Sequence, residues 1–114
     1  MSYKSLLKSN NSGTEFPVFG QKVFIRRLTS TELTAYSDAI DTERSGEASE
    51  AKLNSLGVSL FLSALVNADG SKPKATELPS AQELLAVHSP ADLLEAIILV
   101  QKHSYGTLES ATKN

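Results

Sequence analysis

An apolar hairpin pattern that runs directly into a helix start is the feature that most constrains this chain. It covers residues 16–44, FPVFGQKVFIRRLTSTELTAYSDAIDTER. Apolar residues flank Gly20-Gln21, and glycine as the first residue of a two-residue loop favours a type II′ turn. We therefore predict two strands around this turn, the second of which ends at Leu28. A lone hairpin is marginal in water, so its apolar face must pack on the rest of the chain.

Helix start signals divide the remaining chain into four predicted helices. Thr29-Ser30-Thr31-Glu32 has capping-box spacing and predicts a first helix over 30–44. After a break at Gly46, the second helix begins at Glu47 or Ser49 and runs to Val66. A second capping box over 80–83 opens a short third helix. Ser89-Pro90 predicts the start of the last helix, which Tyr105-Gly106 ends.

These elements predict a mainly α (α+β) fold, with an N-terminal β-hairpin followed by about four helices in one small domain. The 114 residues suit one domain. We expect a flexible N-terminal arm over 1–13, the hairpin plus helical domain over 14–105 and a flexible C-terminal tail over 106–114. The predicted core consists of apolar residues at strand or helix spacing: Val23, Ile25, Leu33, Tyr36, Ile40, Leu56, Leu60, Phe61, Leu84, Leu93, Leu94, Ile97 and Ile98.

Composition argues against several classes of partner. The formal net charge is −2, and Arg26-Arg27 is the one adjacent pair of basic residues, so we expect no nucleic acid partner. The first residues lack the apolar run of a signal peptide, and no apolar stretch is long enough to cross a bilayer. The absence of cysteine excludes a disulfide framework and agrees with a reducing compartment. We expect a cytoplasmic protein without a membrane partner.

No motif in the sequence predicts catalysis, a metal site or a cofactor. The two histidines, His88 and His103, stand at opposite ends of one predicted helix, where a cap or surface role is expected. Asp69-Gly70 resembles part of a calcium loop, but with Gly70 at its sixth position the first and twelfth positions are Leu65 and Thr76, so we interpret it as a turn. P-loop, G-x-G-x-x-G, H-E-x-x-H and G-x-S-x-G patterns are missing. We predict a binding protein that is not an enzyme.

Two predicted elements offer surface for a partner. Hairpin edges are templates for pairing with another chain, and the second helix is apolar over much of its circumference. Gly57 within that helix fits either a close helix approach or simple tolerance. From these elements we predict five partner-binding residues, namely Phe24, Arg26, Arg27, Leu62 and Val66. Whether these apolar residues are core or interface stays open at this point, as does self-association into a homo-oligomer.

The run FGQKVFIRRLTSTELTAY resembles the N-terminal signature of tail assembly chaperones from long-tailed, lambda-like phages and prophages, including their V-x-I-R-x-L-T element. The similarity continues through the helix end and D-G turn over 66–70, through Leu78-Pro79 and through the Leu-rich last helix to Asn114. It therefore covers most of residues 16–114.

The resemblance implies a mainly helical, non-enzymatic protein of the infected cell's cytoplasm. Such a chaperone binds the tape measure protein, helps recruit the major tail tube protein and is absent from the finished virion. The resemblance also implies a longer form made by −1 ribosomal frameshifting, and Lys113-Asn114 is compatible with a slippery codon sequence. The alternatives are a structural tail or head-completion protein and a small helical regulatory protein. The last of these needs a basic recognition helix, which none of the predicted helices provides.

Overall fold

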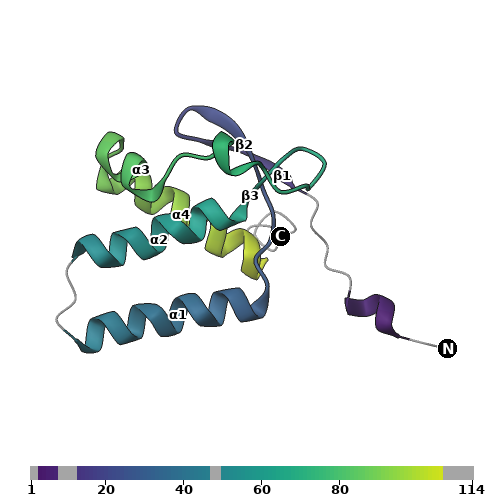
Figure 1. Cartoon of the computed structure of the whole chain (residues 1–114), viewed down its shortest axis with the longest axis horizontal. Coiled ribbons are helices and arrows are strands. Elements are labelled where there is room, and N and C mark those ends of the chain that lie inside the picture. The colour runs from purple at the N-terminus through teal and green to yellow at the C-terminus, as the bar shows by residue number, and fades with distance from the viewer. Residues whose placement is uncertain (1–2, 8–12, 47–49, 107–114) are drawn as a thin grey trace, which may run out of the picture.

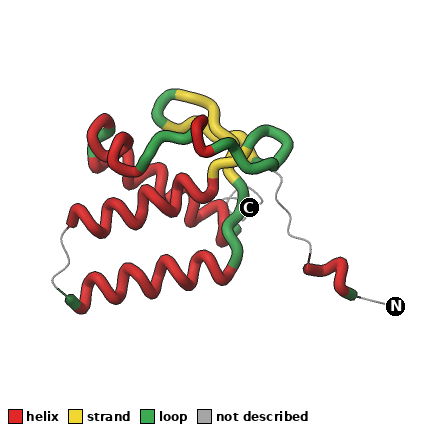
Figure 2. The backbone as a smooth tube through the Cα atoms, viewed as in Figure 1, coloured by secondary structure: helices red, strands yellow, loops and turns green. Residues whose placement is uncertain are grey.

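The protein is a small three-stranded sheet with helices packed mainly against one side of it, as a computed structural model of residues 3–7, 13–46 and 50–106 shows (Figures 1 and 2). The mainly helical class with an N-terminal hairpin is confirmed. The division into arm, domain and tail stays a prediction, and the tail after residue 106 lies outside the described residues. In chain order the elements are η1 (Lys4–Leu7), β1 (Thr14–Val18), β2 (Gln21–Ile25), α1 (Ser30–Ser45), α2 (Glu50–Ala64), β3 (Leu65–Val66), η2 (Ala75–Glu77), α3 (Ala81–Val87) and α4 (Pro90–Tyr105).

The hairpin turn lies one residue earlier than predicted and is of a different type. Val18 pairs with Gln21, which leaves Phe19 and Gly20 as the two-residue loop. Their φ angles are 53° and 75°, and two positive φ values belong to a type I′ turn rather than the expected II′. Both registers place the same alternate residues on the inner face, so the apolar pattern does not distinguish them. The observed register is favoured by Phe19 in the loop, because its ring stacks on the His88 ring with 3.8 Å between the centroids.

A third strand, β3, replaces the expected last turn of the second helix. The helix ends at Ala64, and Leu65 and Val66 pair antiparallel with Ile25 and Phe24 of β2. The prediction of a helix to Val66 is therefore wrong. The following turn over 67–71, closed by backbone hydrogen bonds, ends the strand. As a result β2 is the central strand of the order β1-β2-β3, and its edge is paired within the chain.

Side-chain caps set the helix starts as predicted. Thr29 accepts a hydrogen bond from the Glu32 N–H at 3.2 Å, while the Glu32 carboxylate accepts from the Thr29 N–H at 2.9 Å. Ser80 and Glu83 form the same reciprocal pair at the start of α3. Ser89 caps α4. The expected start of the second helix at Glu47 or Ser49 lies outside the described residues, where the described part of α2 begins at residue 50.

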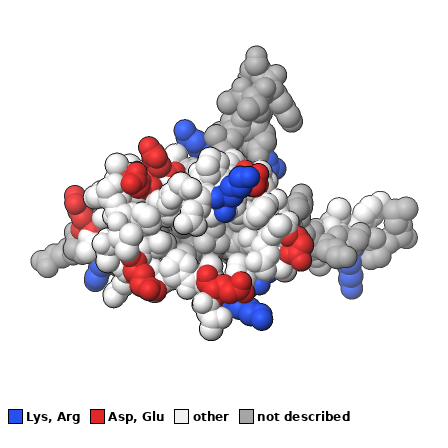
Figure 3. Space-filling model, turned by 90° about the horizontal axis from the view of Figure 1, so that it is seen from above, with Lys and Arg blue, Asp and Glu red and all other residues white. Residues whose placement is uncertain are grey.

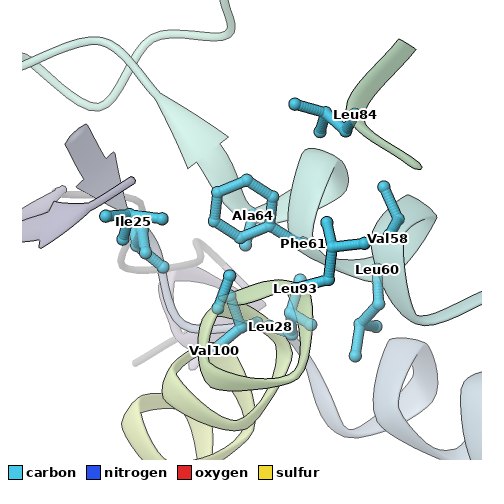
Figure 4. Close-up of a cluster of buried hydrophobic side chains, with 11 residues drawn as sticks. Ile25, Leu28, Val58, Leu60, Phe61, Ala64, Leu84, Leu93 and Val100 are labelled. Atoms are coloured by element: carbon cyan, nitrogen blue, oxygen red, sulfur yellow. The ribbon is translucent and has the colours of Figure 1, made fainter. Parts of the chain in front are cut away.

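The core lies between the sheet, α2 and α4, with Ile25, Val58 and Val100 as its largest fully buried side chains (Figure 4). Six of the predicted core residues are buried, namely Ile25, Leu60, Phe61, Leu84, Leu93 and Ile97. Five more are half-buried, namely Val23, Leu33, Tyr36, Ile40 and Leu56.

The prediction of a core position is wrong for two residues, and one histidine predicted at the surface is buried. Leu94 and Ile98 are 55% and 36% exposed, because α4 turns Leu93, Ile97 and Val100 inward and leaves them on its outer side. His103, expected as a cap or surface residue, is 3% exposed, and its ring lies edge-on to Phe16 at 5.0 Å. The end of α4 therefore packs on the hairpin.

Candidate functional site

Three of the five predicted partner-binding residues line one hollow at the junction of the sheet and α2. Arg26, the residue after β2, Leu62 from α2 and Val66 from β3 surround a volume of about 600 Å³. We call it the strand–helix hollow. The further residues that line it come from the start of α1 and the loop after β3: Glu32, Ser63, Leu65, Gly70, Ser71, Lys72, Pro73 and Leu78. Residues 26 and 66 meet here because β3 pairs with β2, which the sequence did not predict.

The other two predicted residues lie beside the strand–helix hollow, and their exposure differs. Phe24 is half-buried and faces Val66 across the β2–β3 pair. Gly13 lies against both side chains, since a Cβ at this glycine would come within 2.8 Å of Val66 Cγ2 and 2.9 Å of Phe24 Cβ. Val66 is 9% exposed and so belongs to the core, whereas Leu62 is half-buried. Arg27 is exposed and does not line the hollow.

The charged wall of the strand–helix hollow is a two-pronged ion pair. Arg26 donates from Nη1 and Nη2 to the two carboxylate oxygens of Glu32 at 2.8 and 2.7 Å. These hydrogen bonds are the main reason that the pKa of Glu32 falls to about 2. Because Glu32 also closes the α1 capping box, the pair joins the end of β2 to the start of α1. Arg26 is thus a positioning residue as well as part of the wall.

A second apolar hollow, which the sequence did not predict, lies between α1, α2 and α4. Its volume is about 620 Å³, and we call it the three-helix groove. Its apolar walls are Leu33, Tyr36 and Ile40 from α1, Leu53 from α2, and Leu94, Ile97 and Tyr105 from α4. Because the groove is open, the apolar side chains of α1 stay partly exposed, and α1 has no buried residue.

Close contact of α2 with α4 forms the floor of the three-helix groove. A Cβ at Gly57 would come within 2.5 Å of Ile97 Cδ1 and 3.5 Å of the Tyr36 hydroxyl. The glycine therefore allows a close helix approach, which was one of its two interpretations. The sequence feature that could have indicated this groove is Leu94, an apolar residue of α4 that we predicted to lie in the core.

Neither histidine forms a metal site within the described residues. His88 stacks on Phe19 at the hairpin tip, and His103 packs on Phe16. No group of three or more His, Cys, Asp and Glu side chains in the described ranges is placed to hold a metal ion. In the same part of the chain, no helix combines the length and the apolar character that a bilayer crossing needs.

Charge is dispersed over the face that carries the sheet. Figure 3 shows Lys and Arg side chains apart from one another and interspersed with Asp and Glu, with uncharged surface between them. Phosphate binding depends on clustered cations, and the described residues of this face form no such cluster. The two apolar hollows are therefore the candidate sites.

Comparison with known proteins gives one family. A family model described as a phage tail assembly chaperone protein matches residues 2–114. No curated protein matches the chain. No solved structure matches it either.

Proposed function

The chain belongs to the phage tail assembly chaperone family, and on that premise we propose that it binds the tape measure protein in the host cytoplasm and helps recruit the major tail tube protein. The observation that carries the proposal is the strand–helix hollow, an apolar recess on the surface with one charged wall. We further propose that the protein acts by binding, without catalysis or a cofactor, and is absent from the finished virion.

The strand–helix hollow has the chemistry that a helical, aggregation-prone client needs. Leu62, Leu65 and Leu78 supply half-buried apolar surface, which gains free energy when a client's apolar side chains cover it. The Arg26–Glu32 pair is already satisfied internally, so it does not require a charged partner. Reversible contact of this kind would keep a client soluble and still release it.

Co-expression with the cognate tape measure protein tests the proposal. We expect the wild-type chain to keep the client soluble and Leu62→Lys to reduce the soluble fraction about tenfold, because a charge at this wall opposes apolar burial. Val87→Lys is the matched control, since Val87 is 76% exposed and lies outside the hollow. Circular dichroism must show both variants folded.

Two results would contradict the proposal. One is a tape measure protein that is equally insoluble with and without the chain. The other is full rescue by a folded Leu62→Lys variant, which would place client binding elsewhere on the surface. Mass spectrometry of purified virions adds a check on the proposed role, because a structural tail or head-completion protein stays in the particle and a chaperone does not.

A further inference from the structure

The N-terminal arm and the three-helix groove are two exposed apolar surfaces of the same chain. In the arm, Tyr3, Leu6 and Leu7 are 70%, 78% and 85% exposed. In the groove, Leu94 and Tyr105 are 55% and 66% exposed. Figures 1 and 3, which differ by 90°, both show the described part of the arm apart from the helical body. The arm therefore does not fill the groove of its own chain.

The arm has the spacing of a segment that docks into a groove between helices. Tyr3, Leu6 and Leu7 follow the i, i+3, i+4 pattern, and the single turn of η1 begins to form the face on which they would align. An amphipathic helical segment uses this pattern to place its apolar side chains in a hydrophobic groove. The three-helix groove provides Tyr36, Leu94 and other apolar walls for them.

Charge favours the same pairing. Residues 1–13 contain Lys4 and Lys8 and no acidic residue. Helix α1, one wall of the groove, has four acidic residues and one basic residue, a net charge of −3. Asp41 and Glu50 line the groove itself, together with Arg44. A basic arm is thus attracted to an acidic wall, although salt screens this term at the surface.

We propose that the arm of one copy docks into the three-helix groove of a second copy. Reciprocal exchange gives a closed two-fold dimer in which each chain fills the groove of the other. Reciprocity doubles the buried area, which matters because a stable interface needs about 1,200 Å² or more. The proposal goes beyond the binding of a tape measure protein and does not depend on it, because the chain alone is the test sample.

Cysteine cross-linking distinguishes the possible occupants, since the native chain has no cysteine. A Leu6→Cys chain labelled with ¹⁵N is mixed with an unlabelled Leu94→Cys chain under mild oxidation. We expect a mixed-isotope disulfide dimer, identified by mass spectrometry, at a yield about tenfold above the Leu6→Cys and Val87→Cys pair. Val87 is the matched control because it is 76% exposed and lies outside the groove.

A chain that carries both Leu6→Cys and Leu94→Cys reports on the path of the arm. Predominantly intermolecular disulfides at micromolar concentration support exchange between copies. A predominantly intramolecular disulfide would mean that the arm folds back on its own groove, and it would overturn the proposal. Equal yields for the Leu94→Cys and Val87→Cys partners would overturn it as well, because they indicate random collision.

The strength of association gives an independent readout. By sedimentation velocity, Leu6→Asp and Leu94→Asp should each weaken dimerisation about tenfold or more, because each places a charge in the apolar contact. Both positions are exposed in the single chain, so the variants should fold. Val87→Asp should dimerise like the wild type. A wild-type monomer at high micromolar concentration, or unchanged dimerisation of Leu6→Asp, would contradict the proposal.

Discussion

At the scale of single residues, Glu32 combines two structural tasks. Its carboxylate accepts two hydrogen bonds from Arg26 and one from the Thr29 backbone. One side chain thereby caps α1 and ties that helix to the end of β2. Because its pKa is about 2 in the folded protein instead of the ordinary 4.5, folding favours the ionised form. The stabilisation is therefore complete above pH 4.5 and is lost as the pH falls toward 2.

Glu32→Gln should lower the free energy of unfolding by about 1 kcal/mol at neutral pH, a modest effect because water screens a partly exposed pair. The difference from the wild type should shrink at about pH 3, where the wild-type carboxylate begins to lose its advantage. Urea titrations at neutral pH and at about pH 3 measure this difference in the free energy of unfolding. Glu83→Gln is the matched control, since Glu83 has the same capping-box bond and its pKa is lowered by hydrogen bonds with Ser80 rather than by an arginine. Identical pH dependence of the two variants would show that Arg26 contributes nothing.

Phe19 shows where residue-level inference from sequence fails. A phenylalanine at φ 53° is uncommon, because its Cβ crowds the backbone in the left-handed region. Turn propensities therefore favoured Gly20 as the first loop residue. The ring contacts with His88 and Phe61, at 3.8 and 5.8 Å between centroids, come from distant parts of the chain. These tertiary contacts offset the cost of the positive φ at Phe19, and they cannot be inferred from the local sequence.

At the scale of elements, α1 is the least anchored long helix. It has no fully buried residue, whereas α2 and α4 each bury five. Leu33, Tyr36 and Ile40 are half-buried, because the three-helix groove leaves one side of the apolar stripe open. Few buried contacts mean a low free energy of local opening. Docking of an arm in the groove would add the missing contacts.

Amide hydrogen exchange should therefore be faster in α1 than in α2 or α4. Exchange measured by mass spectrometry at low protein concentration should show α1 peptides opening at least about tenfold more often. Raising the concentration should slow exchange in α1 if a second copy covers the groove, and should leave α3 unchanged as an internal control. Equal protection of α1 and α2 would contradict this ranking.

Local signals predicted the element types well and their tertiary partners less well. The capping residues at 29, 80 and 89 identified three helix starts because caps act within one turn. The β2–β3 pair joins residues far apart in sequence, so an apolar run ending in Leu65-Val66 could be interpreted as helix. The strand–helix hollow was predicted in part, through Arg26, Leu62 and Val66. The three-helix groove was missed because burial of Leu94 was assumed from helical spacing.

At the scale of the whole molecule, charge is low and dispersed while the exposed hollows are apolar. The formal net charge is −2, and the charged side chains are dispersed over the face in Figure 3, with uncharged surface between them. Association with a client should therefore depend mainly on apolar burial, which salt does not screen. We expect the affinity for the tape measure protein to change by less than about fivefold between low and high salt. Pull-down at several salt concentrations measures this, and a steep loss of binding would indicate charge pairing instead.

The pairing of β3 with β2 also has a consequence for the order of events during synthesis. Ile25 pairs with Leu65, a separation of 65 − 25 = 40 residues. On the ribosome, the hairpin therefore leaves the exit tunnel before its third strand does. During that interval the outer edge of β2 has no partner in its own chain, and unpaired strand edges invite pairing with other nascent chains. Once the two-residue strand β3 has emerged, it pairs with this edge and ends the period in which other nascent chains can bind there.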